Sequence, residues 1–214
     1  MPSTVNISLL EPDDNLLARA AEIVTAGGLI VYPTETLYGI GADGRNPRAV
    51  DAVQRVKKRK DKKPILLIVP SADVLNGLVT DVSADARRLM ETFWPGPLTL
   101  VFEAVNGLPE GITQGTGTVG VRVPSSALCL NLLRMCGCPL TSTSANISGQ
   151  SPPTTVEAIE QELGNGIELF LNGGTLPPSE PSTVIDVSGN VPRIVREGAV
   201  TRDAIKTILP EIQL

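Results

Sequence analysis

The chain has 214 residues, of which 42% are hydrophobic but only 3% are aromatic, and its formal net charge is −5. This length predicts one domain over 1–214 with an aliphatic core, and the acidic balance argues against a protein that coats nucleic acid. The absence of histidine excludes a Ser–His–Asp or Cys–His mechanism and any imidazole base.

The three cysteines form no recognisable framework. An odd count with one C-x-C pair argues against disulfides and against a zinc site, so we expect no metal site in the protein and a reducing, cytoplasmic setting. No apolar run approaches the roughly 20 residues that a membrane span needs, and the N-terminus shows no signal pattern, so we expect no membrane contact.

Helices and strands alternate along the chain. The apolar patterns and the turn residues predict helices over 13–27, from 46 to the basic run that begins at 57, over 70–78, 83–93, 125–136 and 155–163, and a last helix from Thr201. They predict strands over 29–32, 38–42, 65–69, 98–102, 118–124, 139–144, 167–171, 182–187 and 193–196. This order predicts an α/β fold with an open, twisted, mixed sheet and flanking helices.

Three features indicate a binding site, and each also has a plainer interpretation. Four hydroxyl residues, 141–144, end a strand, where hydroxyls and backbone N–H groups can bind a phosphate or simply satisfy their own turn. The basic run 57–63 ends a helix beside a strand, or is a solvated helix end. Arg122 stands on an apolar strand and needs a carboxylate or phosphate, from a ligand or from an internal ion pair.

Seven motifs then occur in one order along nearly the whole chain. They are YPTET-LYGIG at 32–41, K-x-R-x4-P at 57–64, WPGPLT at 94–99, TVGVRVP at 118–124, STSANISG at 142–149, STV-x-D at 182–186 and R-x-G at 196–198. This set resembles the YrdC/Sua5 family of threonylcarbamoyl-AMP synthases, in its short single-domain form, with a core of about 15–205. The resemblance implies an open sheet wrapped around a concave, positively charged cavity.

The resemblance also implies a reaction. L-threonine, bicarbonate and ATP would give L-threonylcarbamoyladenylate and pyrophosphate, for N6-threonylcarbamoyladenosine in tRNA. The threonine carbamate would attack the α-phosphate, a step that needs positioning and charge neutralisation but no enzyme nucleophile. Mg²⁺ would arrive with ATP without assigned protein ligands, and the product would pass to a tRNA threonylcarbamoyltransferase complex, with possible weak tRNA contact.

Site residues follow from the matching motifs. The resemblance assigns catalysis to Lys57 and Arg59, threonine binding to Thr36, Arg122 and Ser182, and ATP binding to Arg59, Lys63, Thr118, Ser142, Ser144 and Arg196. Thr34 would neighbour the threonine, and Asn146 would order its turn. Many relatives have Pro and Asn where this chain has Lys60 and Lys63, and Ile65 and Ile68 are further departures.

The sequence leaves two other functions to consider, and it predicts one mobile element. An RNA-binding module could use a basic cavity, although aromatic residues are scarce. The carbamoyl-transfer chemistry of hydrogenase maturation belongs to a much larger protein with further segments. Residues 173–183, rich in Gly and Pro, are predicted to form a lid without core packing, which would shield the adenylate from water.

Overall fold

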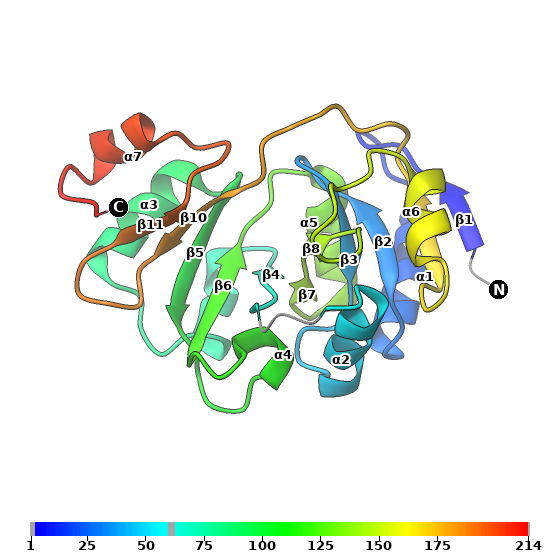
Figure 1. Ribbon diagram of the computed structural model, residues 1–214, viewed down its shortest axis with the longest axis horizontal. Coiled ribbons are helices and arrows are strands. Elements are labelled where there is room, and N and C mark those ends of the chain that lie inside the picture. Colours follow the sequence, from blue (N-terminus) through cyan, green and yellow to red (C-terminus); the bar gives the residue numbers. More distant parts are fainter. Residues whose placement is uncertain (1–2, 60–62, 214) are drawn as a thin grey trace.

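The computed structural model describes residues 3–59 and 63–213 and has an α/β architecture (Figure 1). The helices are α1 (Asp14–Thr25), α2 (Pro47–Val56), the 3-10 helix η1 (Ala72–Gly77), α3 (Ala84–Phe93), α4 (Glu110–Thr113), α5 (Ala127–Cys136), α6 (Val156–Leu163) and α7 (Arg202–Ile208). The strands are β1 (Ser3–Asn6), β2 (Ile30–Pro33), β3 (Tyr38–Gly41), β4 (Leu67–Ile68), β5 (Leu98–Glu103), β6 (Thr118–Arg122), β7 (Leu140–Thr141), β8 (Thr143–Ser144), β9 (Leu169–Asn172), β10 (Thr183–Asp186) and β11 (Arg193–Arg196).

The strands form two open, mixed sheets, whereas the sequence predicted one. One sheet has the order β1-β9-β2-β3-β8 and the other has the order β11-β10-β5-β6-β4-β7. Parallel pairs, such as β5 with β10, occur beside antiparallel pairs, such as β5 with β6. The strand β1 was not predicted, because four alternating residues at a chain end give a weak signal.

Polar caps begin the helices at the predicted places. Asp13 accepts a hydrogen bond from the Asn15 N–H at 2.8 Å and starts α1. Asn46 caps α2, with Pro47 in its first position. Gly137 ends α5 with a φ of 63°, a left-handed conformation that glycine adopts without strain. Local sequence chemistry therefore fixes where these helices begin and end.

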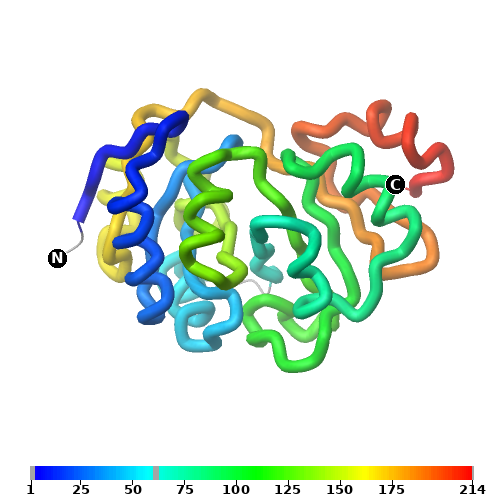
Figure 2. Tube along the Cα trace, turned by 180° about the vertical axis from the view of Figure 1, so that it is seen from behind, coloured from blue at the N-terminus to red at the C-terminus, as the bar shows by residue number. Residues whose placement is uncertain are grey.

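The helices α1 and α5 lie side by side on the back of the molecule (Figure 2). Their apolar faces bury one hydrophobic cluster against β2 and β9, which includes Leu17, Leu132 and Leu169. A larger, aliphatic cluster contains residues of both sheets, among them Val31, Val121 and Ile185. Shared burial of apolar surface therefore holds the two sheets together.

Between the sheets the described chain crosses three times, from β3 to β4, from β7 to β8 and from β9 to β10. The second crossing is the shortest, because β7 and β8 belong to different sheets and only Ser142 separates them. The predicted hydroxyl strand is thus two short strands. These crossings bring polar residues from distant parts of the sequence to one place.

Candidate functional site

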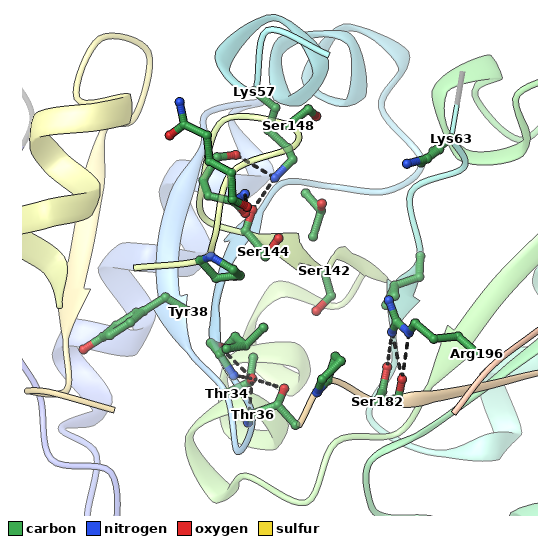
Figure 3. Close-up of a pocket in the computed structure, with 18 of the residues that line it drawn as sticks. Thr34, Thr36, Tyr38, Lys57, Lys63, Ser142, Ser144, Ser148, Ser182 and Arg196 are labelled. Carbon is green, nitrogen blue, oxygen red and sulfur yellow. Dashed lines mark hydrogen bonds between the residues drawn. The ribbon is translucent and has the colours of Figure 1, made fainter. Parts of the chain in front are cut away.

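A cavity of about 520 Å³ lies where the crossings meet (Figure 3). Its described lining includes five basic residues and no acidic ones, together with a set of hydroxyl residues. The basic residues are Lys57, Arg59, Lys63, Arg122 and Arg196. The predicted hydroxyl residues Thr34, Thr36, Ser142, Ser144 and Ser182 also line it. The structure therefore brings together nearly all of the residues that the sequence assigned to a site.

Thr118 is the exception, because it does not line the cavity. It begins β6, whereas Arg122 ends this strand, and its hydroxyl lies 2.8 Å from that of Thr116. Because β6 is extended, Thr118 and Arg122 lie at opposite ends of the strand. The structure gives no support to a role for Thr118 in binding ATP at this cavity.

The tight turn between β2 and β3 is built on Thr34. The Thr34 hydroxyl accepts hydrogen bonds from the N–H groups of Thr36 and Leu37, both at 3.1 Å, and donates to the Leu37 carbonyl at 2.7 Å. The hydroxyls of Thr34 and Thr36 lie 3.0 Å apart. These bonds fix Thr36 at the edge of the cavity and also fix Glu35 between the two threonines.

Arg122 forms the internal ion pair that the sequence left open, and its contact with a ligand stays a prediction. Its guanidinium Nη1 donates to Glu35 Oε1 at 2.6 Å, an internal ion pair, while the residue also lines the cavity. Only 3% of Arg122 is exposed. Glu35 was missed as a site residue although it stands inside the YPTET motif. A buried arginine indicates that an acidic residue lies beside it, but the sequence alone does not identify which residue this is.

Lys57 is buried rather than solvated. Its Nζ donates to the carbonyl of Asn146 at 2.8 Å and to that of Ser144, and its own carbonyl accepts from Ser148 N–H at 3.0 Å. It therefore ties the end of α2 to the turn after β8. Arg59 and Lys63 lie further along the same crossing and line the cavity, while Lys60 and Lys62 lie outside the described residues.

Asn146 orders the turn after β8, as predicted. Its side-chain amide donates to the carbonyls of Ile147 at 2.8 Å and Gln150 at 2.7 Å. Its Oδ1 is buried and has no hydrogen-bond partner within 3–59 and 63–213. Ser142 and Ser144 precede this turn and line the cavity, and Lys57 and Asn146 hold the backbone from Ser144 onward.

Ser182 is held by two neighbours, of which Thr99 was missed by the sequence reasoning. The Ser182 hydroxyl lies 3.0 Å from the buried hydroxyl of Thr99, on the adjacent strand β5. Arg196 Nη2 donates to the Ser182 carbonyl at 2.8 Å and contacts its Oγ at 3.3 Å. Burial, and then the charge of Arg122, lower the pKa of the Arg196 guanidinium. The structure thus gives Arg196 a positioning role besides its place in the lining.

The segment 173–183 corrects one prediction, since part of it is packed. Leu176 is only 5% exposed, joins the larger core and donates its N–H to the Thr154 carbonyl at 2.9 Å. The Tyr38 hydroxyl donates to the Gly174 carbonyl at 2.6 Å and accepts from Gly173 N–H at 3.0 Å. The sequence did not predict this burial, because a single leucine among turn residues gives no periodic apolar pattern. The exposed residues of the segment are 174, 175 and 177–180, and among them Ser179 donates its hydroxyl to the Thr36 carbonyl.

The cysteines contribute no nucleophile. Cys129, Cys136 and Cys138 are free thiols, and burial raises the pKa of each to about 12. They are therefore protonated, and poorly nucleophilic, at neutral pH. Among residues 3–59 and 63–213, no group of three or more His, Cys, Asp and Glu side chains could hold a metal ion. No helix in this part of the chain is long and apolar enough to cross a membrane.

Fold and site together define an α/β protein with a ligand-sized cavity between two open sheets. The family model of the Sua5, YciO and YrdC proteins, described as "Telomere recombination", matches residues 22–198. The chain therefore belongs to the Sua5/YciO/YrdC family.

Individual relatives agree with this membership. A protein of Mycobacterium tuberculosis is 36% identical over 193 residues, which are 90% of this chain and 88% of that protein. The threonylcarbamoyl-AMP synthase of Pyrococcus abyssi is 34% identical over 91% of this chain and 57% of its own length. The structure of P. abyssi Sua5 complexed with L-threonine has a TM-score of 0.93 and 32% identity, over 99% of this chain and 62% of that one. This chain thus spans less than two thirds of the P. abyssi protein.

Proposed function

We propose that this chain is an L-threonylcarbamoyladenylate synthase, a nucleotidyltransferase that uses L-threonine, bicarbonate and ATP. The observation that carries the proposal is the convergence of Arg122, Thr36 and Ser182 with four further cations around one cavity. Relatives named threonylcarbamoyl-AMP synthase, and a relative solved with L-threonine, support it. A small zwitterion and a polyphosphate both need such a lining.

The residues divide into two ends of the cavity (Figure 3). Thr34, Thr36 and Ser182 lie at one end, Lys57 and Ser148 lie at the other, and Ser142 lies between them. In the proposed function the first end, with Arg122, binds threonine. The second end, with Arg59 and Lys63 beside it, binds the phosphates of ATP. The reacting atoms would then meet near Ser142.

The chemistry needs no covalent bond to the protein. The threonine amine, once deprotonated, attacks the carbon of bicarbonate with loss of water, or that of carbon dioxide with release of a proton, to form a carbamate. A carbamate oxygen then attacks the α-phosphorus, the bond to the β-phosphate oxygen breaks, and pyrophosphate leaves. The cations would neutralise charge that builds up on the phosphates, and the turns would hold the reactants in line. This scheme agrees with a chain that lacks histidine and has protonated thiols.

Magnesium would enter as part of the ATP substrate. The described lining offers hydroxyls and the side-chain amides of Asn146 and Gln150 but no carboxylate, so phosphate oxygens and water would supply most of the metal's ligands. We also propose that the product passes to a tRNA threonylcarbamoyltransferase complex, because the adenylate is a reactive mixed anhydride. An RNA-binding module is not favoured, since Tyr38 is the one aromatic residue in the described lining.

Pyrophosphate release from ATP tests the proposal. We expect release only when L-threonine and bicarbonate are both present, with glycine as the control amino acid. Threonine-independent release, or release without bicarbonate, would contradict the proposed reaction.

A further inference from the structure

The ion pair between Arg122 and Glu35 lies directly beside the cavity. Arg122 ends β6, and its guanidinium Nη1 is 2.6 Å from Glu35 Oε1. The exposed fractions of the two side chains are 4% and 17%. A guanidinium buried to this extent needs hydrogen-bond acceptors, and the described cavity lining contains no carboxylate that could supply one.

The pair leaves hydrogen-bonding capacity unused. Arg122 Nε and Glu35 Oε2 are both buried, and neither has a hydrogen-bond partner within the described ranges 3–59 and 63–213. The carboxylate therefore accepts one hydrogen bond from the guanidinium, instead of the two parallel hydrogen bonds of a bidentate pair. A guanidinium held in this way keeps other N–H groups for a second anion.

Glu35 lies in a turn whose backbone is held by hydrogen bonds. It stands between Thr34 and Thr36, and the Thr34 hydroxyl accepts the N–H groups of Thr36 and Leu37. Without the Glu35 acceptor, Arg122 Nη1 would lose its hydrogen bond, and other rotamers of the guanidinium would become accessible.

We propose that Glu35 is a positioning residue for amino-acid binding. It holds one corner of the Arg122 guanidinium so that the remaining N–H groups face the α-carboxylate of the bound threonine. This role rests on the proposed function. It depends on the length of the Glu35 side chain and on its acceptor oxygen more than on its negative charge.

Two conservative variants separate position from charge. Glu35→Gln keeps the length and the acceptor oxygen but removes the charge, whereas Glu35→Asp keeps the charge and shortens the reach. We expect the dissociation constant for threonine, measured by calorimetry, to stay within about threefold for Glu35→Gln. We expect it to rise about tenfold for Glu35→Asp, the size of one lost charge-assisted hydrogen bond. Affinity for ATP should stay within about twofold in both variants.

The double variant with Arg122→Ala tests whether Glu35 acts through Arg122. A general effect of Glu35 on folding would not depend on Arg122 in this way. In an Arg122→Ala background, Glu35→Asp should change threonine affinity less than about twofold. Asp85→Ala breaks an exposed ion pair with Arg88 on α3 and serves as the matched control, with unchanged threonine affinity expected. Urea midpoints of all variants show whether each one is folded.

Several results would overturn the proposal. Glu35→Gln binding threonine more weakly than Glu35→Asp would mean that charge matters and position does not. Equal losses of threonine and ATP affinity would indicate a general structural role. If both variants bound threonine with wild-type affinity, Glu35 would have no role in threonine binding, but the proposed function would not be contradicted. A wild-type chain that binds no threonine would contradict the proposed function itself.

Discussion

Replacing Lys57 by Met tests the inference that this lysine holds the turn after β8. Methionine fills most of the space of the lysine stem, so the change removes mainly the charged donor. Two hydrogen bonds to the carbonyls of Ser144 and Asn146 are lost, and both carbonyls lose a partner in a buried setting. At about 1.5–3 kcal/mol for each bond to a charged group, the loss is about 3–6 kcal/mol. Burying the ammonium group itself costs desolvation energy, and its removal recovers part of this loss, so we expect about 2–4 kcal/mol.

Equilibrium unfolding in urea measures this loss as a fall in the midpoint at constant slope. Lys58→Met is the matched control, because Lys58 is the exposed neighbour and its charge is solvated. ATP affinity should fall in Lys57→Met as well, since the turn that carries Ser144 would be released. A Lys57→Met midpoint equal to that of Lys58→Met would refute the reasoning and return Lys57 to the role of a simple phosphate ligand.

Four further predictions concern binding, dynamics and pH. Arg122→Ala should weaken threonine binding about ten- to a hundredfold in calorimetry while ATP binding persists; equal losses would mean a structural role. Arg59→Ala should lower ATP affinity at least about tenfold, whereas Lys58→Ala should be silent, and similar losses would indicate a diffuse charge effect. Amide exchange at the exposed residues Thr175, Ser179 and Glu180 should slow when ATP and threonine are both present, and unchanged exchange would make this stretch a fixed wall. Because the folded-state pKa of Cys129 is raised to about 12, its contribution to stability is complete below the ordinary thiol pKa and is lost as pH rises toward 12. Cys129→Ala should flatten this alkaline loss in thermal unfolding, and an unchanged slope would contradict it.

The elements of the fold were largely predictable because their signals are local. Caps such as Asn46 and Ser126, and apolar stripes such as that of α2, act within a few residues of one another. The division into two sheets was not predictable, since the pairing of β7 with β4 and of β8 with β3 depends on distant partners. A single strand and two strands that flank Ser142 have the same local pattern.

The site was predictable as a set of residues but not as a network. Ordered motifs named Arg122, Thr36 and Ser182, and the structure brings them to one cavity. The partners that hold them, Glu35 and Thr99, act through contacts across 87 and 83 residues of chain. A motif identifies a residue type at a position, whereas a hydrogen-bond network requires the tertiary fold. For the same reason the sequence could not show that Thr118, which shares a strand with Arg122, lies outside the lining of this cavity, and its role in ATP binding stays a prediction.

The central claim is that this chain joins threonine, bicarbonate and ATP in one product. Incubation with ¹³C-bicarbonate, L-threonine and ATP, followed at once by mass spectrometry, tests this claim most directly. The account predicts threonylcarbamoyl-AMP that carries the label in its carbamoyl carbon, and no such product for Arg122→Ala at low threonine concentration. An unlabelled product, or threonyl-AMP in its place, would contradict the account.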